Sequence, residues 1–248
     1  MSSEGIRDLM HFLGAEEENV LKTTMNFRDD FLLIFNLDIL YKKCLELKPI
    51  DEKELKIPAF LYLNVHREFY LAMTYFLRLH MSKSFCSLRA ALDSVFTAYY
   101  LLRNPEKNDL YKSRVVQKEN KEWDKIFRNI KSTIKADIAN YPEAKGLPEV
   151  HEFCSVHSHS DPLSILQRYK EDKDKLMLEA HYFEYEDSLE DYKKWLGCLL
   201  STFFLIFLIF WKEMFKERAA DKLKEIEIRI DAYSKRITLF REKYRLRS

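Results

Sequence analysis

Apolar residues recur at helical spacing along most of the chain. Between residues 16 and 47 they form one stripe, which stops before Pro49. Two more apolar segments follow, one starting after Pro58 and one running from Ser82, as its N-cap, to Asn104. We expect the latter two segments to be long helices that pair at the centre of the core.

The chain becomes more polar after residue 108. Residues 109–139 predict one amphipathic helix, whose inner face would be formed by Trp123, Ile126, Phe127, Ile130 and Ile134. An irregular segment follows, marked by Pro142, Gly146, Pro148 and Pro162. From Ser188 to the end there is no proline, which predicts a single long helix or two helices that break near residues 218–220.

The last predicted helix carries a coiled-coil pattern. Seven large apolar residues follow one another in alternating steps of three and four, namely Leu223, Ile226, Ile230, Tyr233, Ile237, Phe240 and Tyr244. Such a seam needs a cover, and we expect it to pair with a second copy of the chain. The charges beside the seam make a parallel pair the less repulsive arrangement; they are Lys222, Arg229, Arg236 and Lys243. Two alternatives stay open, because the seam could dock on the protein's own body or its basic edge could bind nucleic-acid phosphates.

The composition agrees with few, long elements. Of 248 residues 47% are hydrophobic, while 4 glycines and 6 prolines are too few for the turns of a many-stranded sheet. We predict an all-α helical bundle with an N-terminal arm (1–54), a bundle core (55–217) and a basic amphipathic C-terminal helix (218–248). Residues 212–248 hold 12 basic and 7 acidic side chains, a net charge of +5.

An uncharged stretch of 17 residues, 195–211, raises the question of a membrane span. Lysine and tryptophan at both borders are typical of a span. As a helix, however, the stretch is about 25 Å long, short of a hydrocarbon core of about 30 Å, and a span would export the basic tail. We therefore favour a buried core helix in a protein that purifies without detergent, with membrane association as the alternative.

Four widely spaced cysteines and the lack of a signal peptide predict a cytoplasmic protein. Cys44, Cys86, Cys154 and Cys198 form no CxxC pair, and the N-terminus lacks a basic segment followed by an apolar one. In a reducing compartment we expect these cysteines to be buried thiols without disulfides.

Residues 151–161 hold the densest group of chemically capable side chains. His151, Cys154 and His157 recur every three residues and His159 follows, so on a short helix they could bind zinc or iron. Because the spacing is not that of a standard zinc module, we favour histidines bonded in a polar crevice and expect no cofactor. A nucleophilic pair of Cys154 and His157 is a further alternative.

Arg89 and Asp93 lie one turn apart on an otherwise apolar helix, which predicts a buried polar network or a pocket in which Arg89 binds an anion. The order of this pair, the Ser155-Val156-His157 element and the final long helix resembles a family of uncharacterised bacterial all-helical proteins. Members of that family are loosely likened to HEPN domains of abortive-infection and toxin systems. The resemblance implies that Arg89, Asp93, Ser155 and His157 share one crevice, in a protein of bacterial defence or stress response. This chain has Asp93 where the family pattern has glutamate.

Common catalytic motifs are missing from the sequence. The RNase activity of HEPN-type proteins depends on an arginine followed after four to six residues by a histidine, whereas Arg7 and His11 are separated by three residues. GxxxxGK[ST], GxGxxG, GxSxG and HExxH are absent as well. We predict an oligomerising interaction or regulatory module. The alternative is a metal-dependent or HEPN-like hydrolase or nuclease whose site would contain Arg89, Asp93, His157 and His159.

Overall fold

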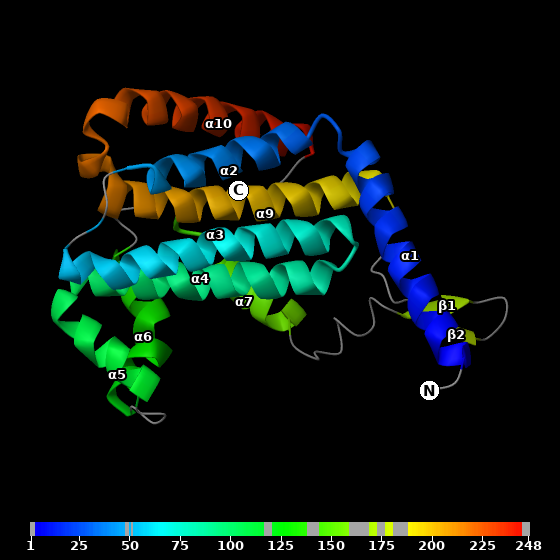
Figure 1. Ribbon diagram of the computed structural model, residues 1–248, viewed down its shortest axis with the longest axis horizontal. Helices are drawn as coiled ribbons and strands as arrows, with labels where there is room; N and C mark the ends of the chain where they lie inside the picture. The colour runs from blue at the N-terminus through cyan, green and yellow to red at the C-terminus, as the bar shows by residue number, and fades with distance from the viewer. Residues whose placement is uncertain are drawn as a thin grey trace.

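The computed structural model describes residues 3–47, 50, 52–116, 121–137, 144–158, 169–172, 177–180 and 188–244. They form an all-α helical bundle, as predicted (Figure 1). The helices are α1 (Ser3–Asn26), α2 (Phe31–Leu45), α3 (Lys56–Leu77), α4 (Met81–Arg103), α5 (Asn108–Val116), α6 (Lys121–Asp137), α7 (Leu147–Ser158), α9 (Leu189–Phe210) and α10 (Leu223–Lys243). An antiparallel ribbon of two strands, β1 (Tyr169–Asp172) and β2 (Met177–Ala180), was not predicted.

The body of the bundle consists of α2, α9, α3 and α4, with α10 lying along α2 and α9 (Figure 1). The helices α3 and α4 form the closest pair, as the two apolar segments predict, and α7 packs on α4. At one end of the bundle lie α5 and α6, and at the other end α1 crosses it obliquely (Figure 1). One core cluster extends from Phe27 to Tyr244 and so includes residues of all three predicted segments.

The prediction of one helix over residues 16–47 is wrong, because a turn at residues 27–30 separates α1 from α2. Asn26, Asp29 and Asp30 favour turns over helix interiors. The corner is held in place from both sides. Phe27 packs edge-on against Phe76 of α3, with 5.4 Å between ring centroids, and Asp30 forms an ion pair of 3.1 Å with Lys193 of α9.

The turn between α3 and α4 is a Schellman motif. The N–H groups of Leu79 and His80 donate to the carbonyls of Phe76 and Tyr75 at 3.0 and 2.9 Å. Leu79 has a φ of 61°, a conformation that usually holds glycine, and burial of its side chain offsets that cost. Since α4 starts at Met81 with His80 at the N-cap, the predicted cap at Ser82 is wrong.

The polar helix predicted over residues 109–139 is two helices, α5 and α6, on either side of residues 117–120. Its inner face is confirmed where the side chains are most buried. Trp123 is fully buried in a small cluster with Ile57 and Leu101, and Ile130 belongs to the main core. The segment predicted to be irregular contains α7, which carries the histidine cluster.

The apolar stretch 195–211 lies in the core, as predicted. Within α9, Phe203 packs on Phe69 and Phe207 on Tyr41, each with 5.3 Å between ring centroids. Among the described residues, α9 with its extension is the one helix long and apolar enough to cross a membrane, and 67% of its most apolar window is buried inside the protein. A core helix enclosed by other helices has this composition too.

The chain reverses direction between α9 and α10, where the sequence allowed a break. A π-helical turn, Trp211–Phe215, ends α9, and two short 3-10 turns lead into α10. Ala220, the first residue of the second turn, has a φ of 30°, and Ala219, between the two turns, is buried. The reversal lays α10 back along the body instead of extending the helix beyond it (Figure 1).

The seam of α10 is covered by the protein's own α2 and α9. Its buried members are Ile226, Tyr233, Ile237, Phe240 and Tyr244, while Leu223 and Ile230 are partly buried against the same core. Of the alternatives that the sequence left open, the structure therefore shows docking on the body. The seam is thus covered within the chain, and self-association of the protein stays a prediction.

Part of the basic edge beside this seam is paired with carboxylates. Lys222 lies 3.7 Å from Glu46 of α2, and Arg229 lies 3.1 Å from Glu225 of its own helix. These pairs reduce the positive charge that the edge offers to phosphates. A nucleic-acid role for α10 stays a prediction.

Candidate functional site

Two of the residues expected in one crevice, Asp93 and Ser155, are joined through His151, between α4 and α7. The Nε2 atom of His151 lies 2.8 Å from Oδ1 of Asp93, so the imidazole N–H donates to the carboxylate. His151 is 1% exposed, whereas about a third of the Asp93 side chain is exposed, 33%. The pair ties α7 to α4 near the protein surface.

The order carboxylate, imidazole, hydroxyl invites comparison with a catalytic triad, but the hydroxyl proton has a different acceptor. Ser155 Oγ donates to the backbone carbonyl of His151 at 2.8 Å, one turn back on the same helix. Its distance to His151 Nδ1 is 3.4 Å, longer than the about 2.6–3.2 Å typical of the bond between a catalytic base and its nucleophile. The bond to the carbonyl stabilises α7, and a catalytic role for Ser155 stays a prediction.

His157 points to different neighbours from those that the resemblance implies. Its Nδ1 donates to the carbonyl of Phe153 at 2.9 Å, and its ring lies on Phe153 with 4.0 Å between centroids. Phe85 of α4 contacts it edge-on. His159, the fourth histidine-cluster candidate, lies outside the described residues.

The thiol of Cys154 is not a nucleophile in this environment. Burial raises its pKa, the nearby Cys198 and Cys86 raise it further, and the charge of Arg89 opposes them only in part. A protonated, buried thiol is inert. The half-buried Arg89 thus lies close to Cys154, and the predicted pair of Cys154 and His157 gains no support.

A metal site was the other alternative for this cluster. Within the described part of the chain, which includes His151, Cys154 and His157, no three His, Cys, Asp or Glu side chains are grouped so that they could hold a metal ion. Zinc or iron binding that depends on His159 lies outside what the structure describes.

A second polar cluster lies between α2 and α3 and contains His66, a polar residue on an otherwise apolar segment of the sequence. Its centre is Asp38, whose Oδ1 accepts hydrogen bonds from His66 Nε2 at 2.8 Å and from Tyr70 Oη at 2.6 Å. Lys42 Nζ lies 2.7 Å from the other carboxylate oxygen. The His66 ring is stacked on Tyr41, with 5.2 Å between centroids and 3° between planes.

These bonds keep Asp38 ionised although it is buried. Burial alone would raise the pKa of this carboxyl group, but the bonds from Lys42, Tyr70 and His66 outweigh it and hold the pKa below its usual range. A signal for this residue was present in the sequence, since Asp38 interrupts an apolar stripe next to Leu37. Its partners on α3 are 28 and 32 residues away, which no local pattern reveals.

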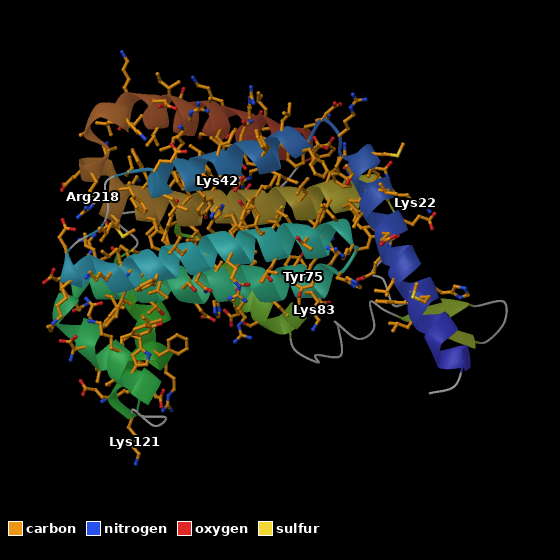
Figure 2. All side chains as sticks on the ribbon, in the orientation of Figure 1. Lys22, Lys42, Tyr75, Lys83, Lys121 and Arg218 are labelled. Carbon is orange, nitrogen blue, oxygen red and sulfur yellow. The ribbon has the colours of Figure 1, made fainter. Side chains whose placement is uncertain are left out.

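Both helices that hold this cluster carry exposed apolar side chains. On α2, Leu32 and Phe35 are both 59% exposed, and on α3, Phe60 is 69%, Leu63 46% and Tyr70 43% exposed. The ammonium group of Lys42 lies 5.8 Å from the centre of the Tyr70 ring and so connects the two helices at the surface. We call this surface the α2–α3 face; it comprises Leu32, Phe35, Lys42, Phe60, Leu63, Arg67 and Tyr70 (Figure 2 labels Lys42).

The spacing along α3 is that of a seam and not of scattered surface residues. Phe60, Leu63, Arg67, Tyr70 and Thr74 follow in steps of three, four, three and four, and all five are exposed. Single exposed apolar residues are common on proteins, whereas three that share one side of a helix with an arginine make this side a candidate interaction surface.

No protein-family model, no curated protein sequence and no solved structure matches this chain. The resemblance to HEPN-like proteins therefore rests on the short motifs around Arg89, Asp93, Ser155 and His157 alone, and it stays a prediction.

Proposed function

We propose that this protein is a helical interaction module that associates with a second copy of itself through the α2–α3 face. The observation that carries the proposal is the exposed stripe of Phe60, Leu63 and Tyr70 on α3, continued on α2 by Phe35. Aromatic side chains and arginine are enriched at the centres of protein interfaces, and this face holds both.

The fixed geometry at the centre of the face suits it to binding. Tyr70 and Lys42 are half-exposed, but both are held by Asp38, which is buried. Side chains that are already ordered lose less conformational entropy when a partner binds. The polar cluster therefore keeps Tyr70 and Lys42 ordered before a partner binds, and the exposed apolar residues of the face would be buried in the complex.

Self-association is tested by light scattering on the whole chain and on Phe60→Glu. We expect the natural chain to form a dimer and the substitution to weaken it by about ten- to a hundredfold, since burial of one phenylalanine contributes about 1.5–3 kcal/mol. Phe60 is 69% exposed, so the fold should not depend on it. Thermal unfolding of both proteins checks that.

Leu239→Glu on α10 is the matched control, because Leu239 is 65% exposed and lies outside the face. This variant should remain a dimer. A natural chain that is monomeric at high micromolar concentration contradicts the proposal. If Leu239→Glu abolishes the dimer and Phe60→Glu does not, the contact lies on α10. That result contradicts the assignment of the contact to the α2–α3 face.

A further inference from the structure

The connection from α9 to α10 contains a strained residue. Ala220 has a φ of 30°, a left-handed conformation that glycine adopts easily and that costs an alanine free energy. Leu79, at the turn between α3 and α4, has the same kind of conformation but buries its side chain, whereas the side chain of Ala220 is exposed. Burial therefore does not offset the strain at Ala220.

The sequence around Ala220 favours a straight helix instead of this reversal. Residues 212–225 read KEMFKERAADKLKE and contain no glycine, proline or β-branched residue, and most of them are strong helix formers. Arg218, which is paired with Glu52, holds the chain just before the bend. We call residues 219–222 the hinge, because straightening them would join α9 and α10 in one long helix.

On the body, α10 runs antiparallel to α9. Lys193, near the start of α9, donates a hydrogen bond of 3.0 Å to the hydroxyl of Tyr244, at the end of α10. Midway along, Phe204 of α9 packs on Tyr233 of α10, with 4.7 Å between ring centroids. These contacts join side chain to side chain, so the same surface on another copy of the chain offers them equally.

The attachment of α10 to its own body has two weak points. The hydroxyl of Tyr233 is buried and has no hydrogen-bond partner among the described residues, which costs free energy because its water has been removed and not replaced. The ion pair of Lys216 with Glu227, at 3.2 Å, joins the chain before the hinge to α10, but both side chains are about half exposed, so it contributes little. Release of α10 therefore costs less than the area of its apolar seam indicates.

We infer that two copies of the chain exchange their α10 helices: the hinge of each copy straightens, and its α10 packs on α2 and α9 of the other copy. Because α10 is antiparallel to α9, the two long helices then lie antiparallel across a two-fold axis. The contacts of α10 with α2 and α9 are re-formed between the chains, while both hinges lose their strain, and short strained hinges favour such an exchange. The inference goes beyond the proposed function, since it uses the inner side of α2 and not the α2–α3 face.

The variant Phe60→Glu, designed to lack association through the α2–α3 face, is the background for the test. It is incubated at high micromolar concentration just below its melting temperature, then cooled, diluted and separated by size. We expect a dimer that persists after dilution, because the chains cannot part until both α10 helices have left their sites. Adding Ala220→Gly should lower the equilibrium constant for this dimer about tenfold or more, since glycine removes the strain that exchange relieves. Ala232→Gly is the matched control, because Ala232 is exposed within α10 and is helical in both forms.

Chemical coupling shows whether α10 is the exchanged part. Lys43 of α2 lies 3.8 Å from Glu225 of α10, so a carbodiimide, which joins amines to carboxylates in contact, can link the two helices. The dimer is formed from equal amounts of isotopically labelled and unlabelled chain, and mass spectrometry identifies the linked peptides. In exchanged pairs about half of these peptides should join a labelled segment to an unlabelled one, as random pairing of the chains gives. In any unexchanged pair both segments carry the same label.

Three results would overturn the inference. They are a background variant with no dimer that survives dilution, an equal dimer fraction for Ala220→Gly and Ala232→Gly, and a surviving dimer whose linked peptides all carry a single label. The proposed function is tested separately, by the rapidly reversible association of the natural chain that Phe60→Glu weakens. Failure of either proposal therefore leaves the other unaffected.

Discussion

The same bond occurs twice in this bundle, once between α2 and α3 and once between α4 and α7. In each case a histidine Nε2 lies 2.8 Å from an aspartate Oδ1, between His66 and Asp38 and between His151 and Asp93. The two pairs differ in which partner is buried. At the first, both side chains are about one-tenth exposed; at the second, the imidazole is 1% and the carboxylate 33% exposed.

Burial determines how much each of these two bonds contributes to the stability of the fold. A buried carboxylate has lost its water and depends on its protein partners, so Asp38 needs all three of its bonds. A carboxylate such as Asp93 can turn to solvent when its partner is lost. We therefore expect the α2–α3 pair to be the stronger determinant of stability, and three measurements examine this expectation.

Asp38→Ala should have the largest effect, a loss of about 3–4 kcal/mol in the free energy of unfolding, because it leaves His66 and Tyr70 without their acceptor. Urea denaturation of the natural chain and the variant measures the loss. Asp38→Asn is the control, since its amide oxygen can still accept one bond and should recover part of the stability. A loss below about 1 kcal/mol for Asp38→Ala would remove the contrast between the two pairs.

His151→Ala should cost about 2 kcal/mol, because it removes a buried ring that contacts Phe96 and a bond to a carboxylate that water can then reach. Ser155→Ala is its control and should change stability by less than about 1 kcal/mol, since that hydroxyl donates to a carbonyl of its own helix. A greater loss for His151→Ala than for Asp38→Ala would reverse the ranking.

The smallest expected effect is on the pH dependence of stability. The folded pKa of Asp38 is lowered, so its contribution is fully present above the unfolded value of about 3.9 and is lost as pH falls through the folded value. The gap in unfolding free energy between the natural chain and Asp38→Asn should therefore narrow below about pH 4. Urea titrations at a series of pH values check this. A gap that stays constant from neutral pH to about pH 2.5 would mean that folding does not lower the pKa of Asp38.

The helices themselves could be read from the sequence because periodicity reports which side of a segment is apolar. This holds for α3 and α4, for the buried stretch within α9 and for the α10 seam. Periodicity does not report what covers an apolar side. The pattern that includes Tyr233 and Phe240 was therefore equally compatible with pairing to a second chain and with docking on the protein's own helices. The turn at residues 27–30 was missed for a related reason, since Phe27 and Phe31 continue one stripe across it.

The polar clusters were harder to predict because their members are far apart in the chain. His157, the histidine of the Ser-x-His element, was expected beside Asp93. His151 lies there instead, 58 residues from Asp93 in the sequence. The two histidines are about 1.7 helical turns apart, so their side chains point in different directions. Asp38 gave a single weak signal, a charge in an apolar stripe, and its partners depend on the packing of α2 on α3.

The helices that pack on α2, namely α9 and α10, are synthesised long after α2 itself. The hydroxyl of Tyr41 donates to the carbonyl of Phe203, 162 residues later, and α10 follows still further on. At roughly 5–20 residues per second, a ribosome needs roughly 8–32 s to make the intervening chain. For that time the inner side of α2 has none of its final neighbours from α9 or α10, so the nascent chain offers chaperones an apolar helix that folding will later hide.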